Sequence, residues 1–351
     1  MRTTYIVTTL ILVSASVYGD EPLIVAHRGA SRDALENTIE AFNLAWEQGA
    51  DAIEGDFHLT RDGHIVCLHN STTEQVANTN LVIRESTLAQ LRELDVGAYR
   101  GEAFKSSIIP TLAEVFSTIP DGRKIYVEVK CGTEIIPALI EEIGKSGLKQ
   151  EQVVVISFSE TVIEEFKSQA PAYKAYWLCN FKKEDSGEIT PALEIVLETL
   201  ALAKADGLSS NINIPAPVLK SVTECGYEWH VWTINDLATA KRFKQWGAQS
   251  ITTDVPGFLK RNLAEQAAEP DESTAARCIR KSGQPDKFVE VRYVDDTLAH
   301  APTQEETRHG YVTFSCYGMD LVFPNSILMA KQTRDSLTAF TWGENYEPVT
   351  F

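Results

Sequence analysis

The stretch GADAIEGDFHLTRDGHIVCLH at residues 49–69 carries the strongest structural signal in this chain. Its apolar run ends in Glu54 and Asp56, which lie two positions apart and would point to the same face of a strand. An Asp-Gly turn then separates two alternating segments, which predicts a β-hairpin over residues 57–66. Because the hairpin returns His69 toward the two carboxylates, we expect a functional site where this strand ends.

Similar apolar runs recur along residues 22–262 and alternate with helical stretches. Apolar residues have helical spacing in Asn37–Gln48, Val162–Ser168 and Leu237–Trp246. Such alternation is typical of βα units around a parallel sheet. The expected strands are Leu23–His27, Ala52–Asp56, Ile125–Lys130, Val153–Ser157, Ala175–Leu178, Asp206–Ser209, His230–Thr233 and Ser250–Thr253.

Eight βα units predict an α/β fold of the closed (β/α)8 barrel type, and the span 22–262 is close to the roughly 250 residues usual for that fold. An open, doubly wound sheet is the alternative. The acidic and histidine motifs favour the barrel because they end several different strands, as barrel active sites do.

Two segments fall outside the alternation. Residues 70–124 are longer than an ordinary βα connection, so we expect a small inserted lobe over the site, with a helix restarting at Pro110–Phe116. Beyond residue 262, Glu265–Thr274 has the composition of a linker. The runs Lys287–Val294 and Tyr311–Phe323 alternate like strands. We therefore expect residues 263–351 to form a linker and a small β-rich region, to which we assign no function.

The first 19 residues resemble a secretory signal peptide. Arg2 is followed by the uncharged apolar stretch Tyr5–Val13 and by small residues that offer a cleavage site at Val17–Gly19. The apolar stretch is short for a membrane span, although an N-terminal anchor helix is the alternative. We expect an exported protein, periplasmic or secreted, with no stable membrane insertion once the signal is removed.

Composition excludes some partners. The 351-residue chain is 44% hydrophobic, enough for a sizeable core, and has a net charge of -17. Such acidity argues against nucleic-acid binding, which needs a surplus of Lys and Arg. The six cysteines show no C-x-x-C zinc spacing and allow 15 pairings, so buried thiols or one or two bridges are both open. The oligomeric state is left open too.

A third carboxylate joins the first two. Glu128, in the segment YVEVK, ends the next strand after Glu54 and Asp56. Three like charges are costly to bury unless a counter-ion accompanies them. Pairing with Lys and Arg would supply one, but three adjacent acids favour a hard divalent cation. Oxygen ligands favour Mg2+ or Ca2+ over zinc.

Two histidines flank the acids in the sequence. His27 ends the first strand, in VAHRGA, and His69 ends the hairpin. Because an unperturbed histidine titrates near pH 6.5, both suit general acid and base roles. They could instead be metal ligands in a zinc or two-metal hydrolase. With three carboxylates present, the acid/base roles are the simpler assignment.

Nearby cations and an aromatic side chain fit a phosphate ester as substrate. Arg28 follows His27, and Lys130 lies two positions after Glu128, so both could contact a phosphate, although they could also simply neutralise the acids. Trp232 could pack on an apolar or glycerol-like group, or be a buried aromatic of the barrel mouth. Cations with a divalent metal point to phosphoryl chemistry.

These segments resemble those of the glycerophosphodiester phosphodiesterase family over roughly residues 23–262. The paired H-R-G and E-x-D motifs carry the resemblance. The matching segments are HRGA at 27–30, ENT at 36–38, residues 49–63, LH at 68–69, PTLAEV at 110–115, VEVK at 127–130, SF at 157–158, WTIN at 232–235 and TDVP at 253–256.

The resemblance implies a (β/α)8 barrel that hydrolyses glycerophosphodiesters to glycerol 3-phosphate and an alcohol. An adjacent glycerol hydroxyl would attack phosphorus, and water would then open the cyclic phosphate. One histidine would take the hydroxyl proton and the other would protonate the leaving alcohol. The family's residues map onto Glu54, Asp56 and Glu128 as metal ligands, His27 and His69 as acid and base, Arg28 and Lys130 as phosphate contacts, and Trp232 as a substrate-side aromatic.

Two positions depart from the family pattern. Leu35 replaces the usual proline before ENT, and Asn70 replaces the usual aspartate after the second histidine. We expect Asn70 to weaken the orientation of His69 or to change its pKa.

Two other functions stay open: a phospholipase D-like or lysophospholipase D-like activity on the same barrel, and a non-catalytic binding protein that has lost turnover.

Overall fold

The computed structural model describes residues 21–184 and 186–264, and beyond them the backbone of short strands between residues 277 and 350. The signal-like segment 1–19 and the linker Glu265–Thr274 lie outside the described residues. Within these ranges no helix combines the length and the apolar composition that a membrane span requires.

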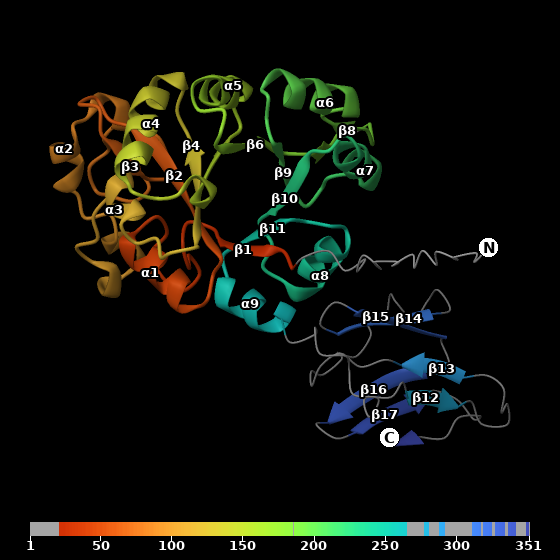
Figure 1. Ribbon diagram of the computed structural model, residues 1–351. Coiled ribbons are helices and arrows are strands. Elements are labelled where there is room, and N and C mark those ends of the chain that lie inside the picture. The colour runs from red at the N-terminus through yellow and green to blue at the C-terminus, as the bar shows by residue number, and fades with distance from the viewer. Residues whose placement is uncertain are drawn as a thin grey trace, which may run out of the picture.

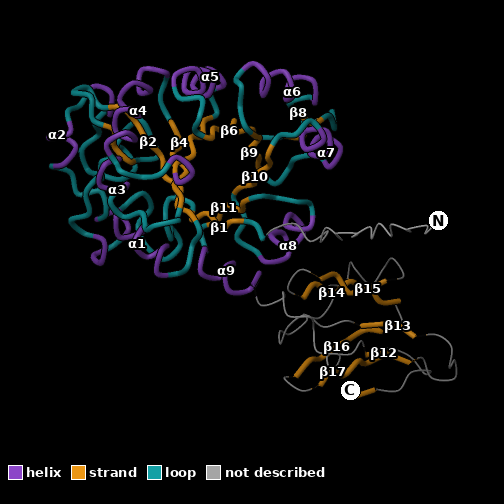
Figure 2. The backbone as a smooth tube through the Cα atoms, in the orientation of Figure 1, coloured by secondary structure: helices purple, strands orange, loops and turns teal. Residues whose placement is uncertain are grey.

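Eight parallel strands close into a barrel, which confirms the predicted fold. Around the barrel the order is β1, β11, β10, β9, β6, β5, β4 and β2, and β2 pairs back with β1. Figure 2 shows this ring of strands inside a ring of helices. The strands are β1 (Leu23–Ala26), β2 (Ala52–Leu59), β4 (Lys124–Val129), β5 (Val153–Ser157), β6 (Lys174–Cys179), β9 (Gly207–Asn211), β10 (Glu228–Trp232) and β11 (Ser250–Thr253).

Helices follow the strands and cover the outside of the barrel (Figure 1). Several begin at side chains that cap the first turn: Thr38, Ser159 and Asp236 each accept a hydrogen bond from a backbone N–H three residues later. The helices are α1 (Ile39–Glu47), α3 (Leu112–Phe116), α4 (Ile136–Lys145), α5 (Glu160–Gln169), α6 (Leu193–Leu202), α7 (Ala216–Glu224), α8 (Leu237–Gln245) and α9 (Pro256–Ala264).

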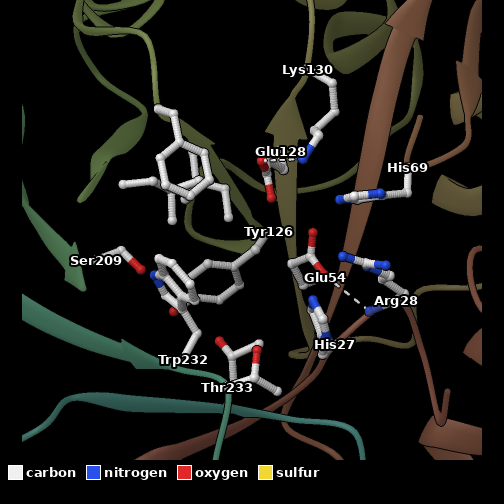
Figure 3. A pocket seen from close by; sticks show the side chains of 14 residues that line it. His27, Arg28, Glu54, His69, Tyr126, Glu128, Lys130, Ser209, Trp232 and Thr233 are labelled. Carbon is white, nitrogen blue, oxygen red and sulfur yellow. Dashed lines mark hydrogen bonds and ion pairs between the residues drawn. The ribbon is translucent and has the colours of Figure 1, made fainter. Parts of the chain in front are cut away.

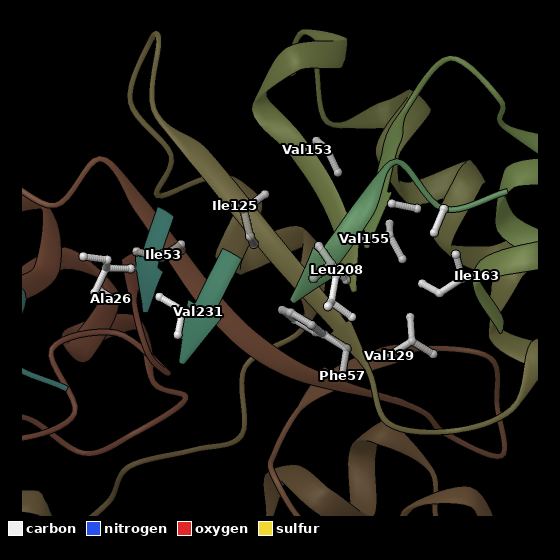
Figure 4. Close-up of a cluster of buried hydrophobic side chains, with 14 of the residues drawn as sticks. Ala26, Ile53, Phe57, Ile125, Val129, Val153, Val155, Ile163, Leu208 and Val231 are labelled. Atoms are coloured by element: carbon white, nitrogen blue, oxygen red, sulfur yellow. The ribbon is translucent and has the colours of Figure 1, made fainter. Parts of the chain in front are cut away.

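The core has two layers, because parallel barrel strands are buried on both faces. One layer lies between strands and helices, and Figure 4 shows part of it, with Ile53, Val155 and Leu208 among its members. The other lies inside the barrel and consists of Val25, Ala52, Tyr126, Val154, Ile156, Tyr176 and Leu178, with Trp232 packed against it. The inner layer forms the floor beneath the strand ends.

The predicted hairpin is present. Strand β2 continues to Leu59 and pairs antiparallel with β3 (Ile65–Cys67). The segment that follows contains α2 (Leu88–Arg92) and the 3-10 turns η1 (Ile83–Glu85), η2 (Ala98–Arg100) and η3 (Glu102–Phe104). It surrounds a small apolar cluster of its own, formed by Val66, Leu68, Ile83, Leu91, Val96 and Ile109. The helix expected at Pro110–Phe116 is α3.

Shorter elements complete the described chain. The 3-10 turns η4 (Thr133–Ile135) and η5 (Gln150–Gln152) precede α4 and β5, and β7 (Lys182–Lys183) pairs with β8 (Ile189–Thr190). The C-terminal strands pair antiparallel, as expected of a β-rich region. They are β12 (Arg277–Arg280), β13 (Phe288–Val291), β14 (Tyr311–Cys316), β15 (Met319–Pro324), β16 (Ile327–Thr333), β17 (Ser336–Thr341) and β18 (Val349–Thr350).

The cysteines of the barrel are free thiols. Cys67 and Cys179 are buried, Cys131 is half-buried and Cys225 is exposed. The side chains of Cys278 and Cys316 lie outside the described residues. No disulfide bridge joins any of the four described cysteines, and the alternative of buried thiols holds for Cys67 and Cys179.

Candidate active site

A cavity of about 200 Å3 opens where the barrel strands end. Seven of the eight predicted site residues line it, as Figure 3 shows for one view of the cavity. The eighth, Asp56, lies directly behind the cavity wall and is 1% exposed. The residues that line the cavity are His27, Arg28, Glu54, His69, Glu128, Lys130 and Trp232.

Strand register brings the three carboxylates together. Glu54 and Asp56 lie on the same face of β2, and Asp56 is in register with Glu128 on β4. One oxygen from each of the three acids lies within 4.8 Å of the others. All three residues are buried, so this is a compact cluster of negative charge at the bottom of the cavity.

Each acid accepts a short hydrogen bond from a donor of the protein. Glu54 Oε2 accepts the backbone N–H of Arg28 at 3.0 Å, Glu128 Oε1 accepts Lys130 Nζ at 2.9 Å, and Asp56 Oδ2 accepts Asn37 Nδ2 at 2.8 Å. Glu54 Oε1 is buried without any hydrogen-bond partner in the described part of the chain. A buried carboxylate oxygen without a partner is costly, and a cation would remove that cost.

The pKa values of the acids also favour a bound cation. Burial, together with the charges of Asp56 and Glu128, raises the pKa of Glu54 well above its ordinary value. Burial and the charge of Asp56 raise the pKa of Glu128 to about 6. Asp56 differs: burial opposes its ionisation, but Arg28, Lys130 and Asn37 lower its pKa. Arg28 and Lys130 thus do not fully neutralise the three acids, and the all-oxygen donor set could hold Mg2+ or Ca2+.

His27 is held by an aspartate that the sequence analysis gave no role. Its Nδ1 lies 2.6 Å from Asp254 Oδ1, and Asp254 Oδ2 accepts Asn235 Nδ2 at 2.6 Å. Burial opposes ionisation of Asp254, but hydrogen bonds from His27, Asn235 and Ser31 lower its pKa to about 2. This ionised partner at Nδ1 fixes the orientation of the His27 ring.

His69 has a neutral partner instead. Its Nδ1 lies 2.8 Å from Asn70 Oδ1, so the asparagine at residue 70 still orients the ring. The buried His58 contacts the carbonyl of His69 through Nε2 at 3.3 Å and helps to fix the end of the hairpin. Burial lowers the pKa of His69, and although Asp56 opposes this, Arg28 and Lys130 add to it. Both imidazoles project toward Glu54 in Figure 3.

Two cations flank the acids. Arg28 has a left-handed backbone (φ 55°), which turns the chain so that its N–H faces Glu54 while its guanidinium reaches Glu36 at 3.0 Å. Lys130 Nζ lies 3.4 Å from Asp56 Oδ1 in addition to its contact with Glu128. Burial opposes the charge of Arg28, but its acidic neighbours raise its pKa. Both side chains are therefore charged and border the cavity.

The opposite wall of the cavity is mostly apolar. Trp232 and Phe158 meet edge to face with their ring centroids 5.6 Å apart, and Ile156 and Leu178 lie beside them. This wall offers hydroxyls from Ser209, Thr233 and Thr252 but no charged side chain. The cavity therefore has a charged half and an apolar half, which suits a molecule that carries one anionic group.

Sequence reasoning missed the residues that hold the site in place. Asp254 lies 227 positions from His27, so no local spacing could connect them. Asn37 and Glu36 belong to the ENT segment, which was recognised as a motif but given no role. The signal that could have found Asp254 was its position directly after the last strand, where its side chain faces the first strand.

Comparison with known proteins agrees with this geometry. The model of the glycerophosphoryl diester phosphodiesterase family matches residues 27–258. A glycerophosphodiester phosphodiesterase from Caldanaerobacter subterraneus subsp. tengcongensis is 32% identical over 242 residues, which cover 68% of this chain and 96% of that protein. One from Bacillus subtilis is 26% identical over 257 residues, covering 68% of this chain and 86% of that protein.

Solved structures share the barrel. A phosphodiesterase from Oleispira antarctica, solved in complex with the product sn-glycerol-3-phosphate, superposes with a TM-score of 0.62 at 24% identity, covering 70% of this chain and 97% of that one. A glycerophosphodiester phosphodiesterase from Thermotoga maritima gives a TM-score of 0.55 at 26% identity, covering 68% and 97%.

Proposed function

Because this chain belongs to the glycerophosphoryl diester phosphodiesterase family, we propose that it hydrolyses glycerophosphodiesters to glycerol 3-phosphate and an alcohol, with one divalent cation and two histidines. One observation carries the proposal: three buried acids gather beside two histidines in a single cavity, and one acid oxygen, Glu54 Oε1, is left without a partner.

Glu54, Asp56 and Glu128 would hold the cation, as Mg2+ or Ca2+. When bound, it would supply positive charge to the phosphate oxygens as negative charge develops on them. Arg28 and Lys130 border the same half of the cavity and would bind the phosphate from the protein side. Trp232, on the apolar half, would pack on the carbon atoms of the substrate.

The different partners of the two histidines support distinct roles. His69, with a lowered pKa and a neutral partner, is unprotonated at neutral pH and would accept the proton of the attacking glycerol hydroxyl. His27, paired with Asp254, would donate a proton to the leaving alcohol as its P–O bond breaks. Water would then open the cyclic phosphate with the roles reversed, which restores both protonation states.

The test of the site combines chelation with substitution. EDTA should abolish hydrolysis of glycerophosphocholine, Mg2+ or Ca2+ should restore it, and His27→Ala and His69→Ala should each lose at least about 100-fold in kcat. Glycerol 3-phosphate and choline should appear together as products. Full activity in either histidine variant, or hydrolysis that EDTA leaves untouched, would contradict the proposed site.

The two histidine roles can be separated by the leaving group. A glycerophosphodiester of p-nitrophenol needs little protonation of its leaving group, because p-nitrophenolate is already stable as an anion. In the first step, measured as single-turnover release of p-nitrophenolate, this substrate should restore much of the rate of His27→Ala but little of that of His69→Ala. The opposite pattern would reverse the assignment, and equal rescue of both variants would refute it.

We also propose that the protein is exported, on the strength of the signal-like residues 1–19. Expression of the full chain should release a mature protein into the periplasm or the medium. Its N-terminal sequence should begin shortly after Gly19. A protein that keeps Met1 and stays in the cytoplasm would rule out export.

A further inference from the structure

We propose that Asn37 is a positioning residue that makes Asp56 present a single oxygen to the cation and thereby favours Mg2+ over Ca2+. The inference rests on the proposed function, because it concerns the same cation. It goes further in naming a residue that fixes how one ligand is used and which ion the site prefers.

Asn37 contacts Asp56 at two points. Its Nδ2 donates to Asp56 Oδ2 at 2.8 Å, and its Oδ1 accepts the backbone N–H of Asp56 at 3.2 Å. The same Oδ1 also accepts Cys67 Sγ at 3.1 Å, which fixes the orientation of the amide. Asn37 is 3% exposed, so no solvent competes for these bonds.

The side-chain amide of Asn37 donates a directed hydrogen bond to Asp56 Oδ2. Arg28 Nε also lies 3.1 Å from Asp56 Oδ2, but its N–H has no aligned acceptor, so this contact is an ion pair without a good hydrogen bond. Asp56 Oδ2 is thus committed to protein donors. The other oxygen, Oδ1, lies 3.4 Å from Lys130 Nζ, a longer contact than either of those to Oδ2.

All three acids follow the same pattern. The Oε2 atom of Glu54 is bound by the Arg28 N–H, and the Oε1 atom of Glu128 is bound by Lys130. In each carboxylate, therefore, one oxygen accepts a directed hydrogen bond from the protein, and the other accepts none within the described residues. Three single oxygens suit Mg2+, which takes six ligands in a strict octahedron and keeps several waters. Ca2+ takes six to eight oxygens and commonly uses both oxygens of a carboxylate.

The backbone explains why asparagine stands at this position. Residue 37 has φ 59°, in the left-handed region that asparagine, aspartate and glycine tolerate best. Its N–H donates to the carbonyl of Arg28 at 3.0 Å, so the turn also closes the loop that carries that residue. Of the three tolerated types, only asparagine supplies a side-chain N–H to Asp56 while still accepting from the backbone.

The test is a measurement of cation affinity by calorimetry on the full chain, without substrate. Asn37→Gly keeps the backbone conformation and removes the directed hydrogen bond to Asp56 Oδ2, while the ion-pair contact with Arg28 stays. Mg2+ affinity should fall about 10- to 100-fold, the usual effect of losing such a partner, while Ca2+ affinity falls less. The Mg2+ Kd divided by the Ca2+ Kd should therefore rise about ten-fold. Asn37→Asp, which keeps the size and the acceptor, should shift the ratio in the same direction.

Asn235→Gly is the matched control. Asn235 holds Asp254 as Asn37 holds Asp56, with Nδ2 on Oδ2 at 2.6 Å and Oδ1 on the backbone N–H at 2.9 Å. This variant should leave both cation affinities within two-fold of the parent, although its turnover should fall through His27. Circular dichroism verifies the fold of each variant.

The outcomes separate the two proposals. If the parent protein binds neither cation, the proposed function fails. If it binds them and both folded Asn37 variants keep the parent's ratio, the positioning role is overturned. If only Asn37→Asp folds, its ratio alone decides, because that variant lacks the same donor.

Discussion

At the scale of single residues, the two histidines line the same cavity but differ in the charge of the side chain at Nδ1. Asp254 carries a full negative charge at Nδ1 of His27, whereas Asn70 offers His69 only an amide oxygen. A carboxylate partner stabilises the imidazolium, and a neutral partner does not. Burial lowers the pKa of His69, and the hydrogen bond with Asn70, which holds the ring, opposes this only in part.

The substitution Asn70→Asp tests this tuning. A carboxylate at Nδ1 should raise the pKa of His69, because it stabilises the imidazolium. Because His69 must be neutral to accept a proton, the acid limb of the kcat/KM profile should move to higher pH by the same amount. Well above both pKa values the variant and the parent should converge. A series of kcat/KM measurements from pH 5 to pH 9 gives the shift.

A control separates the local effect from the added charge. Asn80→Asp adds one negative charge at an exposed position outside the cavity and should leave the profile unchanged. If Asn70→Asp left the acid limb in place, His69 would not be the group whose deprotonation limits the reaction.

The residues that do the chemistry could be predicted, but the residues that hold them could not. Glu54, Asp56 and Glu128 each end a strand, and the shared edge of a parallel barrel brings such residues together. Asp254 contacts His27 from a distant segment, and Asn37 reaches Asp56 from a left-handed turn. Neither type of contact leaves a periodic pattern in the sequence.

At the scale of elements, the loop between β1 and α1 sets the geometry of the site. It carries His27, Arg28 and Asn37, and Arg100 of the inserted segment binds the carbonyl oxygens of Ser31, Arg32 and Ala34. The loop is also joined to the helix it precedes, because the N–H of Ala30 donates to the carbonyl of Ala41 at 2.9 Å. Its conformation is therefore fixed from both sides.

Gly29 lies where this loop and α1 approach most closely. It has φ 82°, and a Cβ there would lie 2.6 Å from the backbone carbon of Ala41. Gly29→Ala should therefore lower the free energy of unfolding by about 2–4 kcal/mol, as the sum of backbone strain and overpacking. Urea unfolding followed by circular dichroism measures this loss.

Gly63 is the matched comparison, in the turn of the hairpin. It has nearly the same φ, 85°, but a Cβ there would meet nothing within 4 Å. Gly63→Ala should cost only the strain, about 1 kcal/mol. Equal costs at both positions would show that the close approach to α1 contributes nothing.

All eight barrel strands could be predicted, because most are short apolar runs and the others, β9 and β11, fall at the expected place in the alternation with helices. The bounds differ by a few residues where the run continues, as in β2, which extends to Leu59 to form the hairpin. The contacts of Arg100 with the loop could not be predicted, because they join carbonyl groups whose positions depend on tertiary structure.

At the scale of the whole molecule, the alternation of strands and helices is enough to predict a closed barrel, because each unit must bury one face against its neighbours. The depth of the cavity does not follow from this alternation. It depends on which inner side chains fill the barrel below the strand ends, and here Tyr126 and Tyr176 do so. Volumes of this kind follow from packing rather than from pattern.

The charge state of the acid cluster makes the stability of the protein depend on pH. Without a cation, burial and Asp56 raise the pKa of Glu128 from about 4.5 to about 6, and Glu54 is raised in the same direction. Between these values the folded protein holds more protons than the unfolded chain, so its stability falls as the pH rises through this window. At pH 7 the penalty is of the order of 2 kcal/mol for Glu128.

A bound cation should remove this penalty because it stabilises the ionised carboxylates. The difference between the Tm with Mg2+ and the Tm with EDTA should therefore be small at pH 5 and grow by several degrees by pH 7. Histidines outside the cavity affect both samples alike and cancel in the difference. Glu128→Gln should remove most of the growth, since a neutral amide neither titrates nor attracts the ion. Thermal unfolding at fixed Mg2+ across this range measures the difference, and one that stays constant would mean that the acid cluster does not bind the cation.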